Sequence, residues 1–169
     1  MTITEAIKAR RSIRKFKQNA PITDSQIHAM LEAAMHAPSA CNTRPWEFIV
    51  VKDRGKLDKI REVHPYTGML ETASLAIVVM ALPETQTRPI DTGYYPQDCG
   101  AATQNILLEA MALGLGTCWC GVYPKEDRIA DVKKILGVEG TPFCIIAVGV
   151  PDEEPKARGF FEEGKVRYI

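Results

Sequence analysis

The chain has 169 residues, of which 46% are hydrophobic and 25% are charged, a composition typical of a globular domain of ordinary size. Lysine plus arginine and aspartate plus glutamate both number 21, so the formal net charge is zero. This balance argues against a nucleic-acid binder or a membrane-surface binder, which would carry a basic excess. The longest apolar run, residues 75–82, is too short to span a bilayer, and no apolar leader is recognisable. We therefore expect a cytoplasmic protein.

The first half of the chain alternates helix and strand signals. Thr2 with Glu5, and Thr23 with Gln26, have the spacing of a capping box, which marks the first turn of a helix. Hydrophobic periodicity continues the second of these helices until Pro38 ends it. The remaining signals predict a helix over residues 3–10, an extended segment over 12–16, a strand over 46–51, a charged helix over 53–61 and a buried strand over 74–82.

The second half begins with a loop over residues 83–96. Residues 98–113 are apolar on nearly all sides, which predicts a buried central helix with Gly114 as its C-cap. Pro124 suits the first turn of a helix that ends at Gly137. A last core strand is predicted over 142–150, followed by a polar tail over 151–169. We expect a single domain over 1–169 in which helices and strands form layers, with parallel and antiparallel pairing both open.

A basic cluster lies where the first helix gives way to the extended segment. In an extended chain, Arg10, Ser12 and Arg14 project to the same side, spaced by about 7 Å. Two guanidinium groups around a hydroxyl suit a phosphate, because arginine binds oxyanions in a bidentate manner. The alternative interpretation is a solvated basic turn.

Two further segments could contact a polar or flat ligand. Residues 38–46 place small and hydrogen-bonding side chains between two prolines, although an ordinary helix-to-strand loop would look similar. Residues 114–121 form a glycine-containing segment whose backbone could approach a flat ligand and bond to its ring nitrogens. This segment lacks the lysine and hydroxyl residue of a phosphate-binding loop.

Metal binding and side-chain catalysis have little support. Cys118 and Cys120 are one residue apart, and no second Cys/His pair has ligand spacing, so no metal site is predicted. The five cysteines are expected to be free thiols, mostly within apolar segments. His28, His36 and His64 pair with no nucleophile motif. Anion-binding and stacking groups without an acid–base set indicate that a bound cofactor carries the chemistry.

Taken together and in this order, these segments resemble the FMN-dependent nitroreductase family along nearly the whole chain. Residues 10–16 (RRSIRKF) are similar to the family's opening R-R/H-S-x-R/K-x-F motif. Residues 38–46 (PSACNTRPW) are similar to its P-S-x-x-N-x-Q-P-W motif, and residues 114–119 (GLGTCW) to its glycine-containing segment. Lys165 and Arg167 stand where the family has a late basic pair.

The resemblance implies an α+β fold with a central, mostly antiparallel sheet flanked by helices. It also implies an intertwined homodimer with two FMN sites at its interface. The implied FMN contacts are Arg10, Ser12, Lys165 and Arg167 at the phosphate and ribityl end, with Arg11 in the same motif; Arg14 at the pyrimidine edge; Pro38, Ser39, Ala40 and Asn42 from the partner subunit; and backbone groups at Trp119, Cys120 and Gly121 near the flavin N5.

The implied activity is that of a ping-pong NAD(P)H oxidoreductase. NADH or NADPH would deliver hydride to flavin N5 and leave, and a small acceptor such as a nitroaromatic, quinone or enone would then be reduced. Arg14 would support the reaction by stabilising the anionic reduced flavin, and no side chain is implied as a catalytic acid or base. Arg44 replaces the family's usual Gln, and the segment 83–96, which commonly shapes the acceptor pocket, is compact.

Two other classes of function stay open. One is a non-catalytic flavin carrier or sensor built on the same fold. The other is a cofactor-free module that binds a phosphorylated or acidic partner through its basic loop. No segment is recognisable that would read the 2′-phosphate of NADPH, so the choice between NADH and NADPH also stays open.

Overall fold

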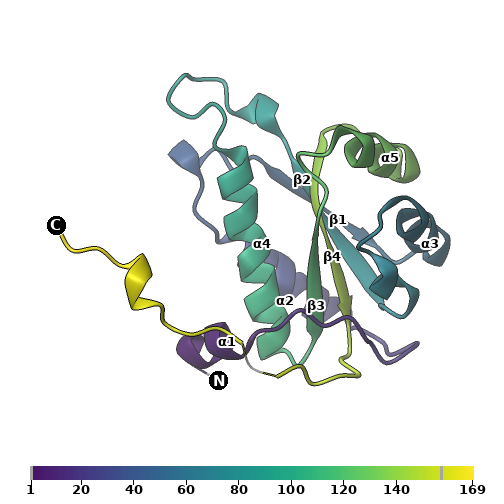
Figure 1. Ribbon diagram of the computed structural model, residues 1–169. Coiled ribbons are helices and arrows are strands. Elements are labelled where there is room, and N and C mark those ends of the chain that lie inside the picture. Colours follow the sequence, from purple (N-terminus) through teal and green to yellow (C-terminus); the bar gives the residue numbers. More distant parts are fainter. Residues whose placement is uncertain (1, 157) are drawn as a thin grey trace.

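The computed structural model describes residues 2–156 and 158–169, and within them helices pack on both sides of one antiparallel sheet (Figure 1). The strands are β1 (Trp46–Val51), β2 (Leu75–Ala81), β3 (Gly116–Gly121) and β4 (Thr141–Gly149). The helices are α1 (Ile3–Ala9), α2 (Asp24–Met35), α3 (Arg54–Val63), α4 (Tyr95–Ala112) and α5 (Glu126–Leu136), with short 3₁₀ turns η1 (Ala40–Asn42), η2 (Gly68–Glu71), η3 (Pro83–Thr85) and η4 (Glu163–Lys165). The strand order is β1-β2-β4-β3, with every neighbouring pair antiparallel, which confirms the α+β expectation.

The two central strands, β2 and β4, are apolar on both faces. All 7 residues of β2 are buried, as its unbroken apolar run predicted. Because successive side chains of a strand point to opposite faces, Leu75, Ile77 and Val79 pack against α2 and α4. Ala76 and Val78 join a second cluster on the other face, beneath α3 and α5. The sheet therefore has helices covering both of its faces.

Local signals fix the ends of the helices. Both predicted capping boxes are present, with Thr2 capping Glu5 and Thr23 capping Gln26. Gly137 ends α5 in the left-handed conformation, at φ 71°, as its sequence position predicted. None of the helices that the structure describes combines the length and the apolar character required to span a bilayer.

The structure corrects the sequence prediction in three places. Residues 116–121, part of the glycine-containing segment for which no strand was predicted, form strand β3, because pairing with β4 overrides weak local strand propensity. The central helix α4 begins at Tyr95, inside the predicted loop, with Pro96 in its first turn. Pro124 lies ahead of α5, whose N-cap is Lys125, and not within the helix.

The extended segment after α1 crosses the end of the sheet beside β3 and β4. Ser12 forms a parallel bridge with Thr117, at the start of β3. Phe16 covers Gly149, the last residue of β4, so closely that a Cβ atom there would lie 2.6 Å from the phenyl ring. Gly149 is therefore required for this close approach, which anchors residues 10–14 against the sheet.

We predict that Gly149→Ala lowers the free energy of unfolding by about 1–3 kcal/mol, because the new methyl group overpacks the site against Phe16. Urea unfolding followed by circular dichroism measures this change. Gly68→Ala is the matched control, since a Cβ there would meet no atom within 4 Å. Equal stability of the two variants would contradict the close packing of Phe16 on β4.

Candidate functional site

A cavity of about 440 Å³ lies beside the basic segment that follows α1. It brings together Arg10, Ser12 and Arg14, as the two-residue spacing of an extended chain predicted. The full lining is Arg10, Arg11, Ser12, Arg14, Glu153, Pro155, Lys156 and Arg158. The two basic residues of the tail were not predicted, because no sequence pattern indicates that the tail returns to this segment.

Hydrogen bonds to the tail hold the basic segment in place. The Glu153 carboxylate accepts from the backbone N–H groups of Arg14 and Lys15, the latter at 3.1 Å. The Arg11 guanidinium donates to the carbonyl oxygen of Arg10 at 2.6 Å and to that of Lys156 at 3.3 Å. Arg11 is thus engaged by backbone acceptors. Neither Arg10 nor Arg14 belongs to an ion pair among the described residues, so both guanidinium groups are available to an anion.

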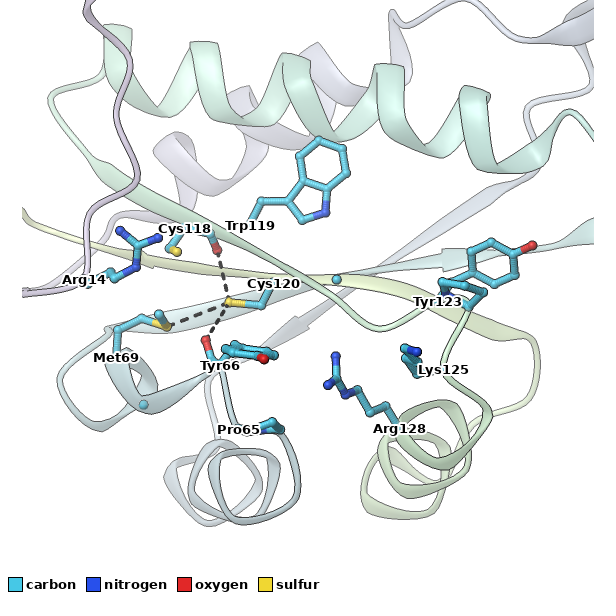
Figure 2. A pocket seen from close by; sticks show the side chains of 13 residues that line it. Arg14, Pro65, Tyr66, Met69, Cys118, Trp119, Cys120, Tyr123, Lys125 and Arg128 are labelled. Carbon is cyan, nitrogen blue, oxygen red and sulfur yellow. Dashed lines mark hydrogen bonds between the residues drawn. The ribbon is translucent and has the colours of Figure 1, made fainter. Parts of the chain in front are cut away.

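A second cavity, of about 690 Å³, runs along β3 (Figure 2). Four consecutive residues of β3, 118–121, line it. Because side chains alternate between the two faces of a strand, four consecutive lining residues mean that the backbone edge itself forms the wall. Arg14 lines both cavities and lies at one end of this wall, with Lys125 and Arg128 at the other. The two cavities therefore adjoin at Arg14.

The edge of β3 that faces this cavity is open. β4 pairs with the inner side of the strand, and Ser12 bridges to the outer side only at Thr117. Over 118–121 the outer edge has no strand partner within the described part of the chain. An unpaired edge presents backbone N–H and C=O groups to a ligand. At its far end the Gly121 carbonyl accepts from Nε2 of the buried His64 at 2.8 Å, which fixes the strand.

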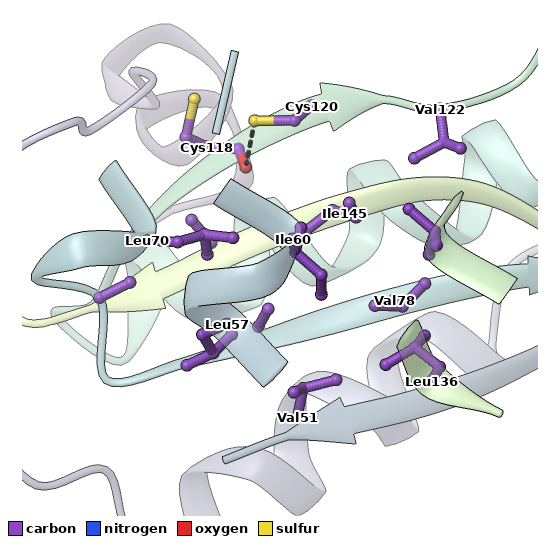
Figure 3. Close-up of a cluster of buried hydrophobic side chains, with 14 of the residues drawn as sticks. Val51, Leu57, Ile60, Leu70, Val78, Cys118, Cys120, Val122, Leu136 and Ile145 are labelled. Carbon is purple, nitrogen blue, oxygen red and sulfur yellow. Dashed lines mark hydrogen bonds between the residues drawn. The ribbon is translucent and has the colours of Figure 1, made fainter. Parts of the chain in front are cut away.

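Two thiols project from β3 to the same side, beneath the cavity (Figures 2 and 3). The neighbouring Cys120 thiol lowers the pKa of the Cys118 thiol to about 7, and the nearby Arg14 acts in the same direction. The Cys118 thiol and burial raise the pKa of Cys120. All five cysteines are free, and four of them are buried. Among residues 2–156 and 158–169, no group of three or more His, Cys, Asp or Glu side chains is arranged to hold a metal ion.

The loop with Pro38, Ser39, Ala40 and Asn42 lies at the other end of α4. The N–H of Ala40 donates to Asp98, in the first turn of this helix, at 3.0 Å. By contrast, Arg10 lines a cavity with residues from the last turn of α4 and beyond. A helix of 18 residues spans about 27 Å. Within one chain, the loop with residues 38–42 and the basic segment with Arg10 therefore do not form a common site.

Arg44, which stands where the resemblance implies a Gln, makes two hydrogen bonds within this loop. Its backbone N–H donates to Oγ of Ser39 at 2.9 Å, and its Nε donates to Oδ1 of Asn42 at 3.1 Å. These two bonds close the loop on itself and fix the orientation of the Asn42 carboxamide. The first bond comes from the backbone, and only the second depends on the Arg44 side chain.

Lys165 and Arg167 lie in an exposed tail that extends away from the sheet (Figure 1). Lys165 forms an ion pair with Glu162 at 2.8 Å, within the same turn of the tail. Neither residue lines the 440 Å³ cavity or the 690 Å³ cavity of its own chain. Their role at the phosphate stays a prediction that requires a second subunit.

We predict that Cys118 is the most reactive buried thiol of the chain at neutral pH. With its pKa lowered from the ordinary value near 9 to about 7, this thiol forms the reactive thiolate at a lower pH. The rate of alkylation by iodoacetamide should therefore rise through pH 7 and then level off. Cys144 should stay unreactive, since burial raises its pKa to about 12. Peptide mass spectrometry across a pH series measures both rates.

The Cys120→Ala variant is the control for this pH profile. It removes the neighbouring thiol that lowers the Cys118 pKa, so the midpoint of alkylation should move to higher pH. An unchanged midpoint would show that the neighbouring thiol does not set the reactivity of Cys118.

Comparison with known proteins places this architecture in a family. The model of the Nitroreductase family matches residues 7–64 and 62–150. A protein of Methanothermobacter thermautotrophicus, provisionally assigned as an NADH dehydrogenase/NAD(P)H nitroreductase, is 44% identical over 168 residues, which cover 98% of this chain and 86% of that relative.

Solved structures agree with this match. A crystal structure from Parabacteroides distasonis with the same provisional assignment superposes with a TM-score of 0.91 at 36% identity, covering 98% of this chain and 96% of the other. An FMN-dependent nitroreductase of Clostridium difficile superposes with a TM-score of 0.88 at 32% identity, covering 98% of both chains. The chain belongs to the nitroreductase family.

Proposed function

We propose that the chain is an FMN-dependent NAD(P)H oxidoreductase that reduces a small organic acceptor. The observation that carries the proposal is the pair of cavities that adjoin at Arg14, one with basic and hydroxyl groups and the other along an open strand edge. The family relatives named for NAD(P)H-dependent nitro reduction and for dependence on FMN support it. Nitroaromatics, quinones and enones form the proposed class of acceptors.

The residues present fit the parts of FMN. Arg10, Ser12 and Arg14 offer two guanidinium groups and a hydroxyl, which suit a phosphate. The second cavity has the volume of a typical cofactor pocket, and its wall of backbone groups suits the heteroatoms along the edge of a flavin ring. Since Arg14 lines both cavities, one molecule with an anionic end and a flat end can span them.

When bound, FMN would accept hydride from a reduced nicotinamide and later donate it to an acceptor. The chain contributes binding, orientation and charge. The cation of Arg14 at the end of the β3 wall favours negative charge on a ring that lies there, and the effect is strongest where water is excluded. The Glu153 carboxylate holds the backbone of Arg14 and so keeps this cation in place.

The proposal includes a homodimer. The loop at residues 38–42 lies at the first turn of α4, whereas Arg10 of the basic cavity lies near its last turn, so a site that uses both requires the loop of a second copy. The tail also carries exposed apolar side chains, with Phe160 at 82% and Phe161 at 75% exposure. Aromatic side chains so exposed on an extended segment are typical of a surface that packs against a partner.

We predict that the purified protein retains FMN, shows a flavin spectrum, and loses its visible absorbance when NADH or NADPH is added without oxygen. Addition of a quinone or nitroaromatic should then restore the absorbance and sustain turnover. Bleaching without turnover by any acceptor would favour the flavin carrier. A colourless protein that takes up no FMN but binds an acidic peptide would favour the interaction module.

The double variant Arg10→Ala/Ser12→Ala tests the phosphate assignment within this experiment. It removes two contacts to the phosphate, so the Kd for FMN should rise by at least about 100-fold. Lys17→Ala is the matched control, because it removes an exposed basic side chain of the same segment that lines neither cavity. Unchanged FMN affinity in the double variant would show that the phosphate binds elsewhere.

We predict that the protein sediments as a dimer, at twice its chain mass of 18.7 kDa. Phe160→Ser/Phe161→Ser should shift it toward the monomer and weaken FMN binding, because the tail loses the apolar surface that packs on the partner. Glu162→Ser/Glu163→Ser leaves that surface unchanged and should stay dimeric. A monomeric parent protein in analytical ultracentrifugation would overturn the homodimer.

A further inference from the structure

A buried pair of polar side chains, Asp98 and Gln86, lies at the N-terminal end of α4. The side chains are 6% and 4% exposed, and neither lines either of the two cavities. Oδ1 of Asp98 accepts from the N–H of Ala40 at 3.0 Å, and Oδ2 accepts from Nε2 of Gln86 at 2.8 Å. Oε1 of Gln86 accepts from the N–H of Tyr95 at 2.9 Å. The pair thus ties the loop at 38–44 to the first turn of α4.

The loop that this pair holds has an unfavourable backbone. Cys41, Asn42 and Arg44 all have positive φ, at 49°, 56° and 49°. Side chains larger than glycine adopt this region at a cost of about 1–3 kcal/mol each, and such residues persist only where surrounding contacts determine the conformation. Buried hydrogen bonds to a carboxylate are among the strongest such contacts.

We propose that Asp98 and Gln86 are positioning residues that hold the loop at 38–44 in the shape required to contact FMN in the partner subunit. The inference rests on the proposed function, because the flavin site assigns the loop its role. Asp98 lines neither cavity and acts through the backbone of Ala40. Gln86 fixes the second carboxylate oxygen and, more weakly, Oγ1 of Thr43 at 3.3 Å.

The pattern of donors and acceptors makes the pair testable. In Asp98→Asn, one oxygen must still accept from Ala40, so the new NH₂ group faces the NH₂ group of Gln86. Rotating the Gln86 amide by 180° moves the conflict to the N–H of Tyr95. Adding Gln86→Glu resolves it, because one oxygen of the new carboxylate accepts from the new NH₂ group and the other accepts from the N–H of Tyr95.

The experiment measures FMN affinity and amide exchange in the full-length protein. Asp98→Asn should raise the Kd for FMN by about tenfold or more and speed hydrogen exchange at the Ala40 amide. The exchanged pair Asp98→Asn/Gln86→Glu should return the Kd to within about threefold of the parent value and restore protection of Ala40. If Asp98→Asn is insoluble, Gln86→Met takes its place in the experiment, because it keeps the side-chain volume but removes both polar groups of Gln86.

Thr103→Val is the matched control on the same helix. Its hydroxyl is fully buried and donates to the carbonyl of Cys99 at 2.7 Å, but it does not contact the loop. This variant should lower thermal stability without changing the FMN Kd or the exchange of Ala40. The comparison separates loop positioning from a general loss of stability.

The outcomes separate this inference from the proposed function. If the parent binds FMN and Asp98→Asn binds it equally well, the positioning role is overturned. The same holds if Thr103→Val weakens FMN binding as much, or if the exchanged pair fails to restore it. If the parent binds no FMN, the proposed function fails. Hydrogen exchange at the Ala40 amide in Asp98→Asn/Gln86→Glu still reports whether Asp98 and Gln86 hold the loop.

Discussion

The burial of β2 and β4 on both faces is the constraint from which the rest of the structure follows. A strand with apolar residues on both sides must be covered on both sides, so α2 and α4 occupy one face and α3 and α5 the other. No space is left for chemistry at the centre of the sheet. The candidate functional groups lie where this coverage ends, at the outer edge of β3 and at the two ends of α4.

The neutral net charge of the chain conceals a strongly uneven distribution. Arg10, Arg14, Lys156 and Arg158 gather around one cavity, and Arg128 stands at the far end of the next. The Arg128 guanidinium lies 5.3 Å from the centre of the Tyr66 ring, which holds it beside the cavity. A local field of this kind attracts an anionic ligand without giving the whole protein the affinity for nucleic acid that a basic excess would bring.

Most of the framework could be predicted from the sequence, because the decisive signals are local. Capping boxes at Thr2 and Thr23 fix helix starts, and the spacing of Arg10 and Ser12 along an extended segment places both on one cavity. Strand β3 escaped prediction because its identity depends on pairing with β4, not on the propensities of glycine and cysteine. Asp98 and Gln86 were not predicted for a similar reason, since only tertiary packing brings them to the backbone of Ala40.

The open edge of β3 also has a consequence for the fate of the protein in the cell. An unpaired strand edge is a template on which another chain can add a strand, the first step of aggregation. Here the edge lies over a cavity that a flat cofactor would fill, so occupancy would protect the same backbone groups from other chains. The yield of correctly folded molecules would then depend on the supply of cofactor during synthesis.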